Sequence, residues 1–291
     1  MASGRPLAEL ALARGRCLRI GSPLVEVTEH TGELAGQPVF WRSAPAEGAP
    51  ALYVHGVPTS SDDWLPFLPL TGGLAPDLPG FGRSGKGGQN DYSLHGIASF
   101  VERFLEMVGV ERVKLVVHDW GGAALAWAIA NPERVERLVI VNAVPLLPGY
   151  RWHWIARTWR LPLAGEMAMG LTLKATMRQV LRPAFAGPVP RAFVDAAWRH
   201  FDQGTQRAIL RLYRSAPEAS LAEAGAGLSH LDAPALVVWG AHDPYLPPRL
   251  GDEYAARLRN ARVEHVTDAG HWPWVDRADL IARIAAFLQD N

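Results

Sequence analysis

The sequence predicts an α/β protein whose mostly parallel sheet is covered by helices on both faces. Short apolar runs rich in β-formers recur along the chain, at 52–54, 113–117, 138–141, 236–239 and 263–266. From residue 113 onward, segments with a helical pattern separate most of these runs, for example 123–130 and 280–288. This alternation is typical of parallel strands joined by crossover helices. Two earlier runs, 25–28 and 38–42, predict an antiparallel pair at the start of the same sheet.

The composition is that of a globular protein with a sizeable core, since 48% of the 291 residues are hydrophobic. The 29 basic and 29 acidic residues balance, so no global field attracts nucleic acid or an anionic membrane. The longest apolar run, 123–130, is too short to span a bilayer, and no secretory signal is visible. A single cysteine, Cys17, excludes an intramolecular disulfide and a multi-cysteine metal site. We expect a soluble, cytoplasmic protein that binds neither nucleic acid nor membrane, of unknown oligomeric state.

Residues 145–230 interrupt the alternation, because they contain no convincing strand and their pattern is helical and tryptophan-rich. Ten Arg and one Lys against five acidic residues give this segment a formal charge of +6. A solvated face or a subunit contact explains that charge without a ligand. A helical insertion between parallel strands predicts a cap over their carboxyl ends, where ligands bind. We therefore divide the chain into a core (1–144 and 231–291) and a cap (145–230).

The segment Gly80–Gly85 matches the dinucleotide pattern G-x-G-x-x-G. That pattern binds a pyrophosphate when its last glycine opens a helix. Here more loop residues follow, at 86–91, so an ordinary glycine-rich turn is expected and no nicotinamide or flavin is inferred. No metal site is evident either, and we expect no cofactor.

The strongest chemical signal follows the run at 113–117, where His118-Asp119-Trp120-Gly121-Gly122 leads into a helix of small residues. A strand, a sharp glycine turn and a helix form the context of a nucleophile elbow. The turn would raise Asp119 above the sheet edge, where an esterase carries serine. Asp119 could also be a helix N-cap, which suits aspartate well.

Two later strand ends favour the catalytic interpretation. Asp243 follows the run at 236–239, and His271 follows the run at 263–266. The chain order nucleophile, acid, histidine is that of the α/β-hydrolases. We therefore predict a catalytic triad of Asp119, His271 and Asp243.

From about residue 25 to its end, the sequence resembles the α/β-hydrolase superfamily. The resemblance rests on the elbow, on His55-Gly56-Val57-Pro58, and on Asp77–Ser84 after the fourth strand. His118-Asp119-Trp120-Gly121 is similar to the branch with an aspartate nucleophile, the epoxide hydrolases and haloalkane dehalogenases. The resemblance implies an eight-stranded, mostly parallel sheet flanked by helices, with a helical cap inserted after strand 6. It also implies an oxyanion hole of the Val57 and Trp120 amides.

An aspartate nucleophile predicts alkyl transfer rather than acyl transfer. A carboxylate that attacks a saturated carbon leaves an ester, and water can hydrolyse that ester. His271 would activate the water, while Asp243 would hold the imidazole in the correct tautomer.

An epoxide substrate needs an acid for its oxygen, which the family takes from cap tyrosines. The segment Ile209–Arg214 resembles the tyrosine–arginine segment of epoxide hydrolase caps, so Tyr213 is the preferred proton donor. A tyrosine packed on the core is the alternative. The second cap tyrosine has no clean match; Tyr150 lies upstream, and Trp154 is near the expected place.

A halide leaving group needs converging N–H donors instead. Trp120 matches one halide-binding tryptophan of the dehalogenases, but Val57 stands where an asparagine commonly supplies the second donor. A cap tryptophan, Trp152, Trp154 or Trp159, could replace it.

Epoxide hydrolysis is the preferred hypothesis, haloalkane dehalogenation the alternative, and a non-catalytic ligand-binding role the third. The expected pocket for a small apolar substrate includes His55, Trp120, Trp154, Trp159 and Trp272.

Overall fold

A computed structural model describes residues 25–290. Its centre is an eight-stranded sheet with the order β1-β2-β4-β3-β5-β6-β7-β8, in which β1 and β2 are antiparallel to their neighbours and the remaining pairs are parallel. The strands are β1 (Thr28–Leu34), β2 (Gln37–Ala44), β3 (Ala51–Val54), β4 (Gly73–Pro76), β5 (Val113–Asp119), β6 (Val135–Ala143), β7 (Ala235–Gly240) and β8 (Ala261–Val266).

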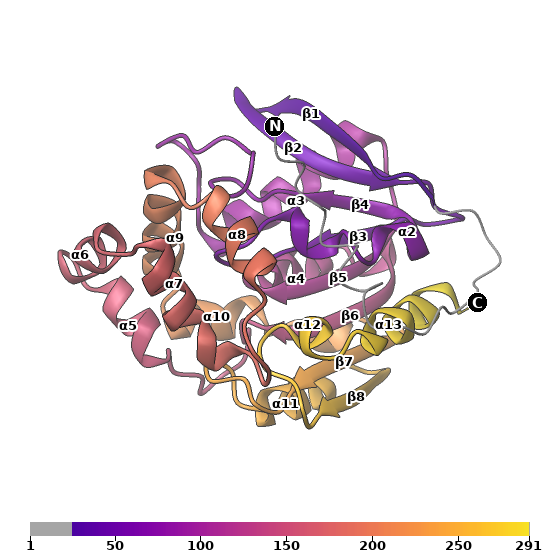
Figure 1. Cartoon of the computed structure of the whole chain (residues 1–291). Helices are drawn as coiled ribbons and strands as arrows, with labels where there is room; N and C mark the ends of the chain where they lie inside the picture. The colour runs from indigo at the N-terminus through magenta and orange to yellow at the C-terminus, as the bar shows by residue number, and fades with distance from the viewer. Residues whose placement is uncertain (1–24, 291) are drawn as a thin grey trace.

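Helices cover both faces of this sheet (Figure 1). The core helices are α2 (Leu68–Thr71), α3 (Leu94–Val108), α4 (Leu125–Ala130), α11 (Arg249–Arg257), α12 (Pro273–Asp276) and α13 (Asp279–Gln289). Between β6 and β7 lie α5 (Trp154–Arg160), α6 (Ala164–Gly170), α7 (Lys174–Leu181), α8 (Arg191–Arg199), α9 (Gln203–Ser215) and α10 (Glu218–Ala224). Short 3-10 helices are η1 (Ser61–Trp64), η2 (Trp120–Ala124), η3 (Pro132–Arg134), η4 (Arg182–Ala184) and η5 (Leu228–His230).

The central strands form here because both of their faces are buried. The residues of β3 and β7 are buried throughout, as are nearly all of those in β5, and they are mostly valine, leucine and alanine. Continuous apolar runs of this kind suit a parallel sheet that helices cover on both sides. The predicted fold class is confirmed, including the helical insertion after strand 6, which we call the cap (residues 145–230).

The strand boundaries differ from the prediction mainly at the start of the sheet. The first strand, β1, begins at Thr28, where the predicted run 25–28 ends, and it pairs with β2 as an antiparallel hairpin. The residues of β1 are half exposed or exposed, so no apolar run marks this edge strand. Cys17 lies outside the described residues. No helix among the described residues is long and apolar enough to cross a membrane.

The sequence predicts that no helix directly follows the glycine-rich loop, and in the structure none directly follows residues 80–88. The loop contacts the cap. The Thr205 hydroxyl of α9 donates to the carbonyl oxygen of Gly80 at 3.0 Å. Lys86 forms an ion pair with Asp202 at 2.7 Å, and Arg211 donates to the carbonyl oxygen of Gly88. These contacts attach the start and the middle of α9 to the core.

Candidate active site

The turn after β5 holds Asp119 in a backbone conformation that few residues adopt. Its φ of 47° and ψ of −121° lie outside the regions common for residues other than glycine. Gly121 makes the turn possible, since a Cβ there would lie 2.1 Å from the carbonyl oxygen of Val54. The Asp119 side chain thereby projects from the carboxyl end of β5, in the manner of a nucleophile elbow.

The structure brings Asp119, His271 and Asp243 together from three separate strand ends. His271 Nδ1 donates to Asp243 Oδ2 at 2.6 Å, and its Nε2 lies 3.6 Å from Asp119 Oδ2. All three side chains are buried. One ring nitrogen of His271 therefore contacts the Asp243 carboxylate, which orients the imidazole, while the other nitrogen faces the Asp119 carboxylate.

Charge and hydrogen bonding set the ionisation of His271 and Asp119. Burial alone would lower the pKa of His271, but the charges of Asp243 and Asp119 and the hydrogen bonds to them raise it to about 10. Burial alone would raise the pKa of Asp119, but His271 holds it below its usual value. Asp119 is therefore ionised at neutral pH, as a nucleophile must be.

Asp243 is held in place by residues that were not predicted from the sequence. The side-chain amide of Asn142, at the end of β6, donates to Asp243 Oδ2 at 2.7 Å. The backbone N–H groups of Tyr245 and Leu246 donate to Asp243 Oδ1 at 2.8 and 3.0 Å. Asn142 has a positive φ of 37°, and its position directly after the predicted run 138–141 was the signal that could have identified it.

Of the two amides predicted to form an oxyanion hole, that of Val57 contacts Asp119. The Val57 amide donates to Asp119 Oδ1 at 2.8 Å. The hydrogen bonds of the described residues include none from the Trp120 amide to Asp119, so that donor stays a prediction. A Cβ at Gly56 would lie 2.3 Å from Asp119, which is why glycine precedes Val57 here.

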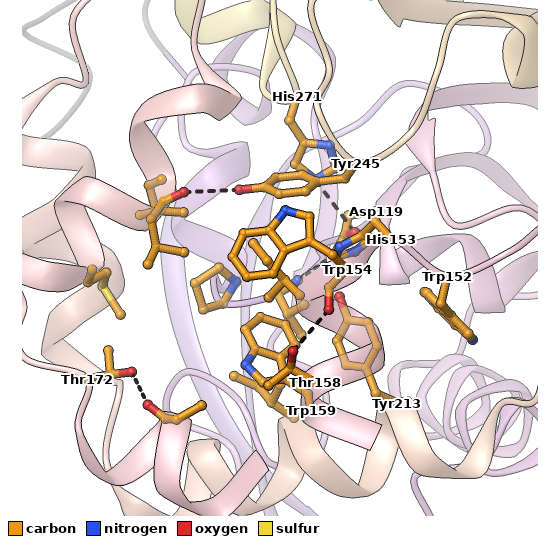
Figure 2. Close-up of a pocket in the computed structure, with 18 of the residues that line it drawn as sticks. Asp119, Trp152, His153, Trp154, Thr158, Trp159, Thr172, Tyr213, Tyr245 and His271 are labelled. Atoms are coloured by element: carbon orange, nitrogen blue, oxygen red, sulfur yellow. Dashed lines mark hydrogen bonds and ion pairs between the residues drawn. The ribbon is translucent and has the colours of Figure 1, made fainter. Parts of the chain in front are cut away.

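A cavity of about 260 Å³ opens in front of Asp119, between the core and the cap. Figure 2 shows Tyr245, Trp154, Trp159 and Tyr213 around this space. Trp272 also lines it, so three of the five predicted pocket residues, Trp154, Trp159 and Trp272, lie on the wall. The wall is mostly apolar, which suits a substrate with little charge.

Two lining residues, His153 and Tyr245, were not predicted. Burial lowers the pKa of His153 to about 4, so this ring is neutral near pH 7. The Tyr245 ring meets His271 edge-on at 5.3 Å, and its hydroxyl donates to the carbonyl oxygen of Val180 at 3.2 Å. The proximity of Tyr245 to Asp243 in the sequence was the available signal.

Two predicted pocket residues do not lie on the cavity wall. His55 is fully buried, and both ring nitrogens bond the backbone: Nδ1 donates to the Gly56 oxygen at 2.7 Å, and Nε2 accepts from the Leu78 amide at 2.9 Å. The ring therefore supports the loop that carries Val57. Trp120 is also fully buried, stacked on Trp152 at 5.4 Å and behind the wall.

The two predicted acids differ in position. Tyr213 lines the cavity, is 3% exposed and meets Trp120 edge-on at 4.9 Å. Burial and the charge of Asp119 raise the pKa of Tyr213 well above 10, and the nearby Trp120 N–H offsets this only slightly. Tyr150 is buried off the wall, with its ring edge-on to Trp152. Tyr150 is not among the residues that line the cavity, so its role as a proton donor stays a prediction.

The three cap tryptophans that could donate to a halide differ in hydrogen bonding and exposure. Trp152 Nε1 donates to the carbonyl oxygen of Ala216 at 3.0 Å, so its N–H is already bonded. Trp154 is 73% exposed at the mouth of the cavity, and Trp159 is half-buried on its wall. Residues 25–290 hold no cluster of three or more His, Cys, Asp or Glu side chains that could bind a metal ion.

Comparison with known proteins defines the class. Residues 50–278 match the family model described as the alpha/beta hydrolase fold, and the chain belongs to that family. Haloalkane dehalogenases of three bacteria are similar to it; that of Mycolicibacterium paratuberculosis is 32% identical over 84% of this chain and 85% of its own. Epoxide hydrolase 2 of Caenorhabditis elegans is 26% identical over 83% of this chain and 74% of its own.

A solved structure is also similar to this chain. The crystal structure of haloalkane dehalogenase DbeA from Bradyrhizobium elkani superposes with a TM-score of 0.79 at 25% identity, covering 90% of this chain and 98% of that one. The protein is thus a hydrolase of the aspartate-nucleophile branch. The preference for an epoxide substrate receives less support than the dehalogenase alternative, because dehalogenase names are more frequent among the relatives.

Proposed function

We propose that this hydrolase displaces a leaving group from a saturated carbon through an alkyl ester on Asp119, and that haloalkanes are its first candidate substrates. The observation that carries the proposal is the position of Asp119, ionised, bonded to the Val57 amide and 3.6 Å from His271. A serine at this position would favour acyl transfer, whereas a carboxylate favours alkylation.

The reaction proceeds in two balanced steps. Asp119 attacks the carbon that bears the halogen, a C–O bond forms, and halide leaves with the bonding electron pair. Water then attacks the ester carbonyl while His271 accepts its proton, with the Val57 N–H available to the developing oxyanion. The products are an alcohol, a halide ion and a proton, and Asp119 is restored.

The names of the relatives support halide as the leaving group, and so does Trp120. This residue directly follows Asp119, and its buried indole N–H has no hydrogen-bond acceptor among the described residues. An unpartnered buried donor is costly unless a ligand completes it. Tyr213 covers this indole from the cavity side, so a halide would meet the phenol O–H as well.

Epoxide opening is the second candidate, and the position of Tyr213 specifically favours it. Its phenol is on the cavity wall near Asp119, whose charge contributes to its raised pKa. A phenol can give its proton to the alkoxide that forms when an epoxide ring opens, because an alkoxide is the stronger base. A halide ion needs no proton at all.

The test is a side-by-side assay of the purified protein on 1-bromobutane and styrene oxide, measuring bromide and diol. Dehalogenation predicts bromide release that falls strongly in Trp120→Phe and by a smaller factor in Tyr213→Phe, because the halide would contact both donors but needs no proton. Epoxide hydrolysis predicts diol formation that falls by roughly 10²- to 10⁴-fold in Tyr213→Phe, the usual size of an acid–base contribution. Tyr150→Phe is the matched control, since this tyrosine is buried off the wall.

Bromide without diol supports the first candidate, and diol without bromide supports the second. Formation of the alkyl ester is common to both candidates and can be measured separately. When the second step is blocked, either substrate should leave an alkyl group on Asp119. Turnover of either substrate by Asp119→Ala would contradict the proposal as a whole.

A further inference from the structure

The outer helices of the cap expose an unusual amount of apolar surface. Among the described residues, eight large hydrophobic side chains are exposed, and seven of them belong to the segment 154–180. We call these seven the cap patch: Trp154, Leu161, Leu163, Met167, Leu171, Leu173 and Val180. They lie on or beside α5, α6 and α7, at the end of the molecule farthest from β8 and α13 (Figure 1).

Part of the cap patch follows one helix, and part of it lies beside the catalytic cavity. Leu163, Met167 and Leu171 are four residues apart, so they align on one side of α6. Trp154 and Val180 belong both to the cap patch and to the wall of the catalytic cavity. The cavity therefore opens within the cap patch.

The same surface is basic. Residues 151–182 contain five arginines and one lysine but a single acid, Glu166, which pairs with Arg214 at 2.7 Å. Arg151, Arg157 and Arg178 are exposed, and none of them forms an ion pair with any described residue. Exposed apolar side chains surrounded by arginine are typical of surfaces that lie on anionic lipid.

We propose that the cap patch docks onto an anionic lipid surface and that an apolar substrate enters the catalytic cavity from there. The balanced charge of the whole chain gave no reason to expect a membrane partner, but the cap carries +6 and the rest −6. Charge complementarity selects the lipid over a second copy of this chain, because an isologous contact would bring two basic surfaces together. A second copy would also cover the mouth of the cavity.

Docking is tested by flotation with vesicles of phosphatidylglycerol and phosphatidylcholine, against vesicles of phosphatidylcholine alone. The wild type should float with the anionic vesicles at low ionic strength and detach as salt is added. The triple variant Leu163→Gln, Met167→Gln, Leu171→Gln should need at least tenfold more lipid. None of these three residues lines the cavity, and all are exposed, so the fold should persist, as a thermal melt will check.

Matched controls separate the cap patch from general effects. Val263→Gln removes the eighth exposed hydrophobic residue, on β8, and should leave flotation unchanged. Arg157→Gln and Arg178→Gln should each weaken binding about fivefold, since a basic residue near an anionic surface contributes about 1 kcal/mol. Arg103→Gln, exposed on α3, should have no such effect.

Three results would overturn the proposal: no flotation with anionic vesicles at low salt, equal flotation of the triple variant and Val263→Gln, or a wild-type dimer that the triple variant dissociates. The part of this proposal that concerns substrate entry rests on the proposed function, whereas the part that concerns docking is independent of it. If docking holds, the triple variant should lose turnover of a long-chain bromoalkane dissolved in vesicles but retain turnover of 1-bromobutane in water. A wild-type protein that floats with anionic vesicles but turns over neither bromoalkane would count against the proposed function and leave docking standing.

Discussion

His271 lies between two carboxylates, so its basicity depends on the state of Asp119. With both carboxylates ionised, the pKa of His271 is raised to about 10. In the proposed mechanism, alkylation turns Asp119 into a neutral ester and removes one of the two charges. The pKa of His271 then falls, which makes the neutral imidazole available when water has to be deprotonated. The first step thus prepares the base for the second.

Replacing His271 separates the two steps. In His271→Gln, Asp119 keeps its carboxylate, so alkylation continues, but ester hydrolysis loses its base and slows by roughly 10²- to 10⁴-fold. Intact mass spectrometry should then show the protein plus one alkyl group within the first turnover. Asp119→Asn is the control that should acquire no mass, and normal steady-state turnover by His271→Gln would exclude the triad.

At the scale of the element, the elbow depends on close approach between β3 and the turn after β5. A Cβ at Gly121 would meet the Val54 carbonyl oxygen at 2.1 Å, whereas at Gly122 the nearest atom, Cβ of Ala143, is 3.1 Å away. A backbone carbonyl in a buried strand cannot move by the ångström or so that a Cβ at Gly121 would require. At Gly122 the Ala143 methyl group and the Val144 carbonyl oxygen, at 3.1 and 3.2 Å, need to shift by only a few tenths of an ångström.

Gly121→Ala should therefore destabilise the protein by about 1–3 kcal/mol or more, the usual cost of overpacking. For a chain of this size that lowers the melting temperature by roughly 2–12 °C. Gly122→Ala, one residue later, should lower it by less than half as much. Circular dichroism melts of the two variants measure this difference, and equal losses would contradict the stated role of Gly121.

At the scale of the whole molecule, the free energy of unfolding depends on pH through two neighbouring carboxylates, Asp62 and Asp63, which act in opposite directions. Burial raises the pKa of Asp63 to about 7, although the Thr59 hydroxyl, 2.6 Å away, partly opposes the shift. Burial alone would also raise the pKa of Asp62, but the guanidinium groups of Arg42 and Arg83, at 2.7 and 3.1 Å, hold it below its usual value.

The native state keeps a proton on Asp63 that the unfolded chain loses above about pH 4, so Asp63 reduces stability as pH rises from about 4 to about 7. Asp63→Asn should leave stability unchanged near pH 4 and increase it by about 1–4 kcal/mol near pH 8. Asp62→Asn should be destabilising above about pH 4, since it breaks two ion pairs. Urea unfolding across this pH range measures both, and a destabilised Asp63→Asn at pH 8 would refute the assignment.

Much of the fold follows from local pattern. The buried strands and the helices at 123–130 and 280–288 are recognisable because the side chains of one element share one environment. The exposed edge strand β1 and the short interior strand β4 are harder to recognise, because β1 carries no apolar run and the four residues of β4 are too few to show a period. The triad is predictable for a similar reason, because polar residues that end parallel strands meet at one edge of the sheet.

The sequence alone determined the fold class, the order of Asp119, Asp243 and His271, and hence the preference for alkyl transfer. Only the tertiary structure decided which aromatic residues line the cavity: Tyr213 and Trp159 are on its wall, while Tyr150 and Trp120 are not. Cap helices can rotate or shift against the core without any change in their own pattern, so contacts across the cavity leave no local signature. The same holds for Asn142, whose amide meets Asp243 only because β6 and β7 are adjacent.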